Sequence, residues 1–203
     1  MYLKKISILF AVLLFVSLSS IVCADFDFLV KKDHSPLPSY GTWKILVRIY
    51  TDCFCPPCRA MEPKIDPILI GLVKKNIINL TFVDTPISKS SALYARYFLY
   101  IVNENKDFEL ALRARSVLIG ASLEKITDQV KLKEYLKNKW MIFKPFDTKP
   151  AFDMLNGYLK EDKIHSTPTC VINLDGKVKQ YTGGPEILSA LERLKGGMLS
   201  LLK

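Results

Sequence analysis

Four consecutive residues, Cys55, Pro56, Pro57 and Cys58, place two cysteines at C-x-x-C spacing after an apolar run and before a helical pattern. Two thiols on one helical turn can close a disulfide, and the first then lies at the helix N-terminus, where the helix dipole favours a thiolate. Thiol–disulfide exchange needs an attacking thiolate and a second thiol that resolves the mixed disulfide. We therefore interpret Cys55 as the nucleophile and Cys58 as the resolving thiol.

Other roles for the cysteines are weaker. A structural bridge between Cys55 and Cys58 would close too short a loop to stabilise the chain much. Cys53 could join them as a third thiolate around copper(I) or zinc, but the two intervening prolines suit helix entry better, so we expect no metal and no cofactor. Cys53 and Cys170 could form a second bridge, or Cys170 could be a buried thiol that packs as a small hydrophobe, and both alternatives stay open.

The elements around the motif follow from apolar spacing. Residues 43–50 form a nearly continuous apolar run, which predicts a buried central strand. Residues 59–75 repeat apolar side chains at helical spacing, and Pro63 and Pro67 inside this pattern should kink or divide the helix. Residues 77–83 predict a second strand, and a short strand is expected near residues 26–31.

The second half of the chain first turns helical and then returns to strands. Helical patterns cover residues 88–102, 107–119, 127–139 and about 150–160. A strand at residues 170–173, a turn at Asp175 and Gly176, a strand at 177–181 and a closing helix at 185–194 complete the chain.

The N-terminus carries the three parts of a secretory signal peptide. Lys4 and Lys5 precede an apolar segment at residues 6–16, and small and polar residues follow up to Ala24. The apolar segment is shorter than the roughly 20 residues that a membrane-spanning helix needs. We predict a signal peptide at residues 1–24, cleavage near Ala24 and a periplasmic or otherwise extracytoplasmic protein of one domain, residues 25–203.

The distribution of charge along the chain argues against nucleic acid as a partner. The whole chain carries a net charge of +9, with 29 Lys and Arg against 20 Asp and Glu. Its lysines are scattered, and no Arg-rich or aromatic-interleaved stripe emerges. A soluble basic surface is therefore expected, with no nucleic-acid groove.

Three features together resemble the thioredoxin fold. They are the cysteine motif, Pro63 five positions past it, and the pair Thr167 and Pro168 before the strand at 170. The helical patterns at about 88–148 resemble the insertion of its DsbA-like branch. The resemblance implies an α/β thioredoxin-like fold with a helical insertion between its two halves. It also implies a cis peptide bond at Pro168, beside the redox cysteines, and a substrate chain that pairs with the backbone of Thr167 as an added strand.

The resemblance further implies an exported thiol–disulfide oxidoreductase. Its partners would be exported proteins with cysteines or disulfides, together with a membrane redox partner that resets the pair. Oxidation, isomerisation and reduction all use this chemistry. Two alternatives remain: a thiol reductase for cytochrome maturation, and a copper-handling thioredoxin-like protein that uses Cys53, Cys55 and Cys58.

The chain departs from the DsbA-like pattern at two places. DsbA-like enzymes carry Pro-His between the cysteines, whereas Pro56 and Pro57 supply neither a side-chain donor nor a backbone N–H. We expect a thiolate less stabilised than in strong oxidases, although Arg59 adds positive charge nearby. Thioredoxins also bury an acid on the strand leading into the motif, where this chain has Arg48 or Ile49.

Overall fold

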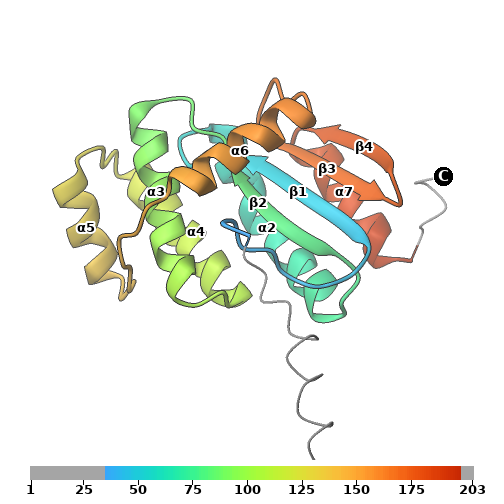
Figure 1. Cartoon of the computed structure of the whole chain (residues 1–203), viewed down its shortest axis with the longest axis horizontal. Coiled ribbons are helices and arrows are strands. Elements are labelled where there is room, and N and C mark those ends of the chain that lie inside the picture. Colours follow the sequence, from blue (N-terminus) through green and yellow to red (C-terminus); the bar gives the residue numbers. More distant parts are fainter. Residues whose placement is uncertain (1–34, 198–203) are drawn as a thin grey trace, which may run out of the picture. The chain divides into compact units, whose positions relative to one another are not determined.

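A four-stranded mixed sheet lies at the centre of the computed structural model, which describes residues 35–197. The elements below all belong to one compact unit, which begins at Pro36. The strands are β1 (Ile45–Thr51), β2 (Asn79–Asp84), β3 (Thr169–Leu174) and β4 (Lys177–Thr182), in the order β2-β1-β3-β4. β1 pairs parallel with β2 and antiparallel with β3, and β3 pairs antiparallel with β4 (Figure 1).

Helices cover both faces of this sheet. α2 (Pro56–Lys74) and α7 (Gly184–Lys195) pack together beneath one face, where Ile45, Val47 and Ile49 of β1 are buried against their apolar sides. α6 (Lys149–Glu161) lies on the other face (Figure 1), where Ala151 and Leu155 join the apolar cluster of Tyr50, Val83 and Val171. The alternation of side chains along β1 thus gives each face its own core.

Three helices follow β2 and form a block beside the sheet (Figure 1). They are α3 (Lys89–Glu104), α4 (Phe108–Leu123) and α5 (Gln129–Asn138), and α4 packs against both α3 and α5. Each helix begins at a polar N-cap, because the side chains of Ser88, Asp107 and Asp128 accept hydrogen bonds from backbone N–H groups of the first turn. None of the helices in residues 35–197 is long and apolar enough to cross a membrane.

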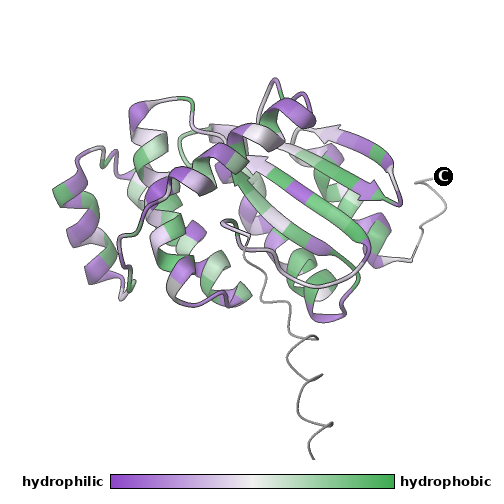
Figure 2. Cartoon of the chain, viewed as in Figure 1, coloured by the Kyte–Doolittle hydropathy of each residue, from purple (hydrophilic) through white to green (hydrophobic). Residues whose placement is uncertain are grey.

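The elements follow the predicted order, and their bounds agree within a few residues. Figure 2 shows hydrophobic residues concentrated in the central strands, whereas the edge strand β4 is mostly hydrophilic. Of the two outcomes predicted for Pro63 and Pro67, a kink or a division of the helix, the division was wrong, because α2 runs through both as a single helix. Its buried face, with Ile65, Leu69 and Leu72, packs into the main core and supports the helix where the proline N–H donors are missing. The predicted signal peptide at residues 1–24 and the strand predicted near residues 26–31 lie outside the described residues.

The outer edge of β2 is covered by the chain that precedes β1. Tyr40 exchanges two backbone hydrogen bonds of 2.8 Å with Leu80. Gly41 makes this approach possible, because its φ is +87° and a Cβ there would lie 2.1 Å from the carbonyl oxygen of Ile78. The segment therefore closes one edge of the sheet.

Candidate active site

The cysteine motif lies where β1 ends and α2 begins. The N–H of Cys55 donates to the carbonyl of Asp52 at 3.1 Å, and the Asp52 carboxylate accepts from the N–H of Phe54 at 2.6 Å. This turn delivers Cys55 to the N-cap of α2 with extended backbone angles, and Pro56 and Pro57 occupy the first helical positions. Proline is favoured there because its ring presets the helical φ and its missing N–H would have no partner within the helix.

The two sulfurs of the motif lie 2.6 Å apart, with the Cys58 thiol as donor to Cys55. Cys58 is completely buried, whereas Cys55 keeps 7% of its surface exposed. Burial, together with the hydrogen bond to Cys55, raises the pKa of Cys58 to about 12. At neutral pH Cys58 therefore keeps its proton and can donate it to the neighbouring sulfur.

The loop before β3 reaches the same point from the other half of the chain. The Thr167–Pro168 peptide bond is cis, as the resemblance implied. The carbonyl oxygen of Thr167 lies 3.5 Å from the sulfur of Cys55, and the carbonyl of Pro168 accepts a hydrogen bond from Gly183 at 2.9 Å. Residues 112 positions apart thus meet at one sulfur.

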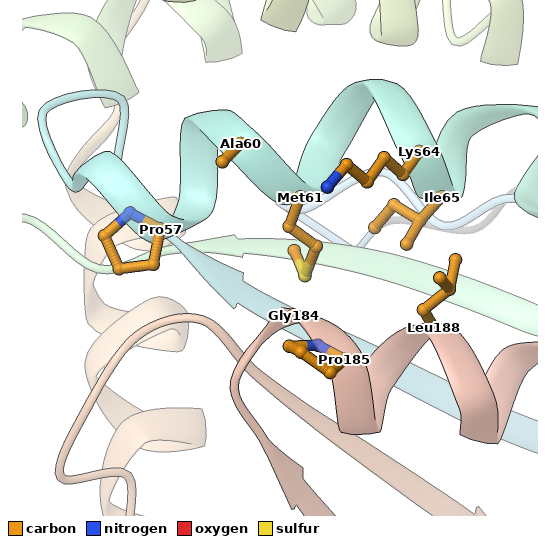
Figure 3. Close-up of a pocket in the computed structure, with 8 residues that line it drawn as sticks. All are labelled: Pro57, Ala60, Met61, Lys64, Ile65, Gly184, Pro185 and Leu188. Atoms are coloured by element: carbon orange, nitrogen blue, oxygen red, sulfur yellow. The ribbon is translucent and has the colours of Figure 1, made fainter.

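An apolar pocket of about 290 Å³ opens next to the motif, between α2 and the start of α7 (Figure 3). Residues from both helices line it: Pro57, Ala60, Met61, Lys64, Ile65, Gly184, Pro185 and Leu188. Gly184 brings α7 close, since a Cβ there would lie 3.4 Å from that of Met61. No sequence pattern predicts this pocket. The one local signal is Gly183-Gly184-Pro185, which marks a helix start without showing what the helix faces.

Behind the motif, Arg115 of α4 is buried in a cluster of polar side chains. Its guanidinium forms a bidentate pair with Glu62 of α2, at 2.7 and 3.0 Å, and contacts Asp84 at the end of β2 at 3.1 Å. It also donates to the hydroxyl of Thr51, at the end of β1. We call Arg115, Glu62, Asp84 and Thr51 the Arg115 cluster. It joins the helical block to β1 and α2, the elements on either side of the cysteine motif.

As the sequence indicates, β1 carries no buried acid at the position where thioredoxins have one. Ile49 is completely buried in the apolar core, and Arg48 faces the opposite side of the sheet, where it pairs with Asp162 at 2.9 Å. Asp52, Glu62 and Asp84 are buried carboxylates near the motif. Burial raises the pKa of Asp84, although the Arg115 guanidinium opposes this rise.

Cys53 and Cys170 are both buried, and both are free thiols in this structure. The carbonyl of Cys53 accepts a hydrogen bond from the Ser122 hydroxyl of α4 at 2.7 Å. Burial raises the pKa of Cys170 to about 12 and that of Cys53 well above its usual value, so both stay protonated at neutral pH. No group of three or more His, Cys, Asp or Glu residues within 35–197 is placed to hold a metal ion.

The order β2-β1-β3-β4, the cysteine motif at the start of α2 and the cis proline before β3 define a thioredoxin fold. Its helical block between β2 and β3 gives the DsbA-like arrangement, so the predicted α/β fold class is confirmed.

Solved structures share this fold at low sequence identity. A periplasmic thioredoxin-like protein from Salmonella enterica serovar Typhimurium is 20% identical, with a TM-score of 0.58 over 81% of this chain and 93% of its own. Proteus mirabilis ScsC in a transitional conformation is 18% identical, with a TM-score of 0.63 over 83% of this chain and 74% of its own.

The thiol-disulfide exchange protein alpha-DsbA2 from Wolbachia pipientis is 15% identical, with a TM-score of 0.57 over 79% of this chain and 86% of its own. No protein-family model and no curated protein sequence matches the chain. The likeness to the solved structures is therefore one of fold.

Proposed function

We propose that this protein is a thiol–disulfide oxidoreductase that exchanges disulfides with cysteines of other proteins through Cys55 and Cys58. One observation carries the proposal: the two sulfurs lie 2.6 Å apart at the N-terminus of α2, and the backbone of Thr167 approaches Cys55 at 3.5 Å. The arrangement supplies an attacking sulfur, a protonated resolving thiol and a backbone edge beside them.

Each step of the exchange forms one S–S bond and breaks another. When Cys55 and Cys58 are joined, a substrate thiolate attacks the sulfur of Cys55, the bond between the two cysteines breaks, and Cys58 leaves and takes up a proton. A second substrate thiolate then attacks the substrate sulfur of this mixed disulfide and expels Cys55 as a thiolate. Two electrons pass from the substrate dithiol to the pair, and the reverse sequence reduces a substrate disulfide.

The substrate chain would lie along the loop before β3. Thr167 offers its backbone for a strand-like pairing that holds the target sulfur against Cys55 and reads little sequence. The pocket beside Pro57 would take an apolar side chain next to the target cysteine, and Lys64 at its wall adds a single positive charge. Partly folded chains, which expose apolar residues next to cysteines, fit such a site.

The surroundings of Cys55 favour an intermediate redox potential. Within residues 35–197 its sulfur hydrogen-bonds only to Cys58 and to the carbonyl of Thr167, so no charged side chain stabilises the thiolate directly. Pro56 and Pro57 also remove two of the N–H donors that a helix N-terminus normally offers. The pair should therefore be a weaker oxidant than one with a histidine between its cysteines.

The location and partners form the finer part of the proposal. The signal pattern at residues 1–24 supports export, and the similar Salmonella protein is described as periplasmic. The proposed partners are exported proteins with cysteines or disulfides and a membrane redox partner that resets the pair. Copper handling has no geometric support, since Cys53, Cys55 and Cys58 form no metal-ligand cluster in the described chain.

A trapping experiment tests the function. The Cys58→Ala variant, produced in its own compartment, should accumulate reductant-sensitive covalent complexes with other proteins, because Cys55 can form the mixed disulfide but nothing resolves it. The control carries Cys55→Ala as well and should trap none. A Cys58→Ala variant that accumulates no complexes would rule out the proposal.

The direction of exchange is measured by equilibrating the purified protein with glutathione. A tenfold change in the equilibrium constant corresponds to about 30 mV for this two-electron couple. We expect a potential between those of strong oxidases and reductases.

A further inference from the structure

A second surface lies at the end of α5, on the side of α3 and α4 that faces away from the sheet (Figure 1). Trp140 and Ile142 are 83% and 81% exposed, which makes them the two most exposed large hydrophobic residues within 35–197. Three exposed lysines, Lys137, Lys139 and Lys144, flank them in sequence. We call these five residues the α5 tip, and it shares no residue with the cysteine site.

The backbone fixes the direction of Trp140. α5 ends in a left-handed turn in which the N–H of Trp140 donates to Lys137 at 2.9 Å and that of Met141 donates to Leu136 at 3.0 Å. Trp140 has a φ of +58°, in the region that favours glycine or asparagine. The other non-glycine residues with positive φ in the described chain are all polar: Asn76, Lys125, Lys163 and Asp175. Here the chain instead places a large apolar ring at a conformationally costly position and leaves it in solvent.

Burial alternates along the residues that follow. Met141 is buried, and Phe143 packs edge-on against Tyr97 with ring centroids 5.2 Å apart. The N–H of Lys144 donates to the carbonyl of Tyr100 at 3.3 Å. These inward contacts anchor the segment on α3, so Trp140 and Ile142 are held outward on a fixed base.

The charge around the tip is mostly positive. Residues 129–144 contain five lysines and a single acid, Glu134. Arg113 of α4 adds a further cation, since its guanidinium donates to the carbonyl of Lys139 at 2.9 Å. The α5 tip thus combines an exposed tryptophan and isoleucine with several neighbouring basic side chains.

We propose that the α5 tip docks the protein on an anionic lipid surface. Tryptophan is favoured at the membrane–water interface, and exposed apolar side chains bordered by lysines bind there by combining shallow insertion with attraction to acidic headgroups. Each lysine near such a surface adds to the binding free energy through charge attraction alone. The charge complementarity and the two isolated apolar side chains fit the headgroup layer of a bilayer, and the inference stands independently of the thiol chemistry.

Fluorescence of a single tryptophan tests the proposal at the site itself. The chain contains two tryptophans, Trp43 and Trp140, so the Trp43→Phe variant of the exported form, residues 25–203, reports on Trp140 alone. Vesicles of phosphatidylcholine mixed with phosphatidylglycerol should shift its emission to the blue and protect it from acrylamide, and vesicles of phosphatidylcholine alone should do neither. An emission that stays unchanged with both vesicles overturns the proposal and leaves an acidic protein surface as the partner to test.

Two matched pairs of variants separate binding from folding. Trp140→Gly should lower vesicle affinity about tenfold or more by removing the apolar ring, while glycine suits the left-handed backbone and should preserve or raise stability. Lys163→Gly makes the same backbone change at the end of α6 and should leave vesicle binding unchanged. Equal vesicle affinities for these two variants would contradict the proposal.

The second pair concerns charge. The double variant Lys137→Glu, Lys139→Glu should lose about fivefold in affinity or more for each lysine. Its control, Lys177→Glu with Lys195→Glu, changes the net charge equally on β4 and α7 and should bind nearly as the parent protein does. An equal loss in both would mean that only the net charge matters, and the α5 tip would be rejected as a site.

Discussion

Two arginines attach helices to opposite faces of the sheet, and they differ in how far solvent reaches them. Arg115 reaches from α4 to the motif-side face and is 3% exposed, whereas Arg48 lies on β1 itself, faces α6 and is 19% exposed. Each pairs with two carboxylates, and a hydroxyl completes each cluster: Thr51 with Arg115, and Tyr50, bonded to Asp162, with Arg48. The face that carries the cysteine motif thus has the cluster that is less exposed to solvent.

The difference shows which contacts hold the cysteine site in place. Of the partners of Arg115, Thr51 lies at the end of β1, Asp84 at the end of β2, and Glu62 on α2 one turn past Cys58. The Arg115 cluster therefore fixes the elements that carry the cysteines. Arg48 stacks on Tyr158 at 3.9 Å and pairs with Asp162 and the exposed Glu161, so it mainly attaches the C-terminal end of α6. Removing the two arginines should therefore have unequal effects.

The largest effect is expected for Arg115→Met. Removing one partner of a buried ion pair leaves uncompensated charge, at a cost of about 3–5 kcal/mol of unfolding free energy. The loss should shrink as the pH falls, because burial raises the pKa of Asp84, which can then take up a proton. Urea unfolding at neutral and acidic pH measures both, and a loss below 1 kcal/mol at neutral pH would contradict this role.

Arg48→Met should cost less, about 1 kcal/mol, because water reaches this cluster and screens the pairs. High salt should weaken the contribution of Arg48 more than that of Arg115. Urea unfolding of both variants at low and high salt makes the comparison. If Arg48→Met proved as damaging as Arg115→Met, exposure would not explain the difference between the faces.

Asp66 offers a finer test of the motif-side cluster. It lies one turn beyond Glu62 on α2, and burial followed by repulsion from Glu62 raises its pKa to about 6. Because this pKa lies above the unfolded value, folding is favoured while Asp66 is protonated, and that stability is lost as the pH rises from about 4 through 6. Asp66→Asn should therefore gain about 1 kcal/mol at pH 8, after allowance for its partial exposure, and almost nothing at pH 4. A gain that does not depend on pH would exclude the charge as its cause.

The smallest effect concerns the redox pair itself. Neither arginine hydrogen-bonds to a sulfur of the motif, so Arg115→Lys and Arg48→Lys should each change the glutathione equilibrium less than about threefold. Replacing Pro57 by histidine provides the contrast, because a side-chain donor next to Cys55 should make the pair more oxidising. A larger shift from Arg115→Lys than from Pro57→His would place the control of the potential in the Arg115 cluster.

What the sequence predicted depended on local signals. Apolar spacing located every strand and helix of the described chain, and the C-x-x-C spacing with the Thr-Pro pair identified residues that the structure brings together at Cys55. The Arg115 cluster escaped prediction because its partners lie 31 to 64 positions away, and no local pattern links them. The pocket beside Pro57 depends on the approach of α7 to α2, which periodicity cannot reveal.

The two edges of the sheet are protected in different ways. Tyr40 covers β2, whereas the outer edge of β4 has no strand partner within residues 35–197. β4 carries Lys177 and Lys179 at alternate positions, and lysines on an edge strand oppose pairing with the same strand of another copy. The substrate pairing proposed at Thr167 would then have no competing site on β4, whose lysines oppose open-ended growth of the sheet.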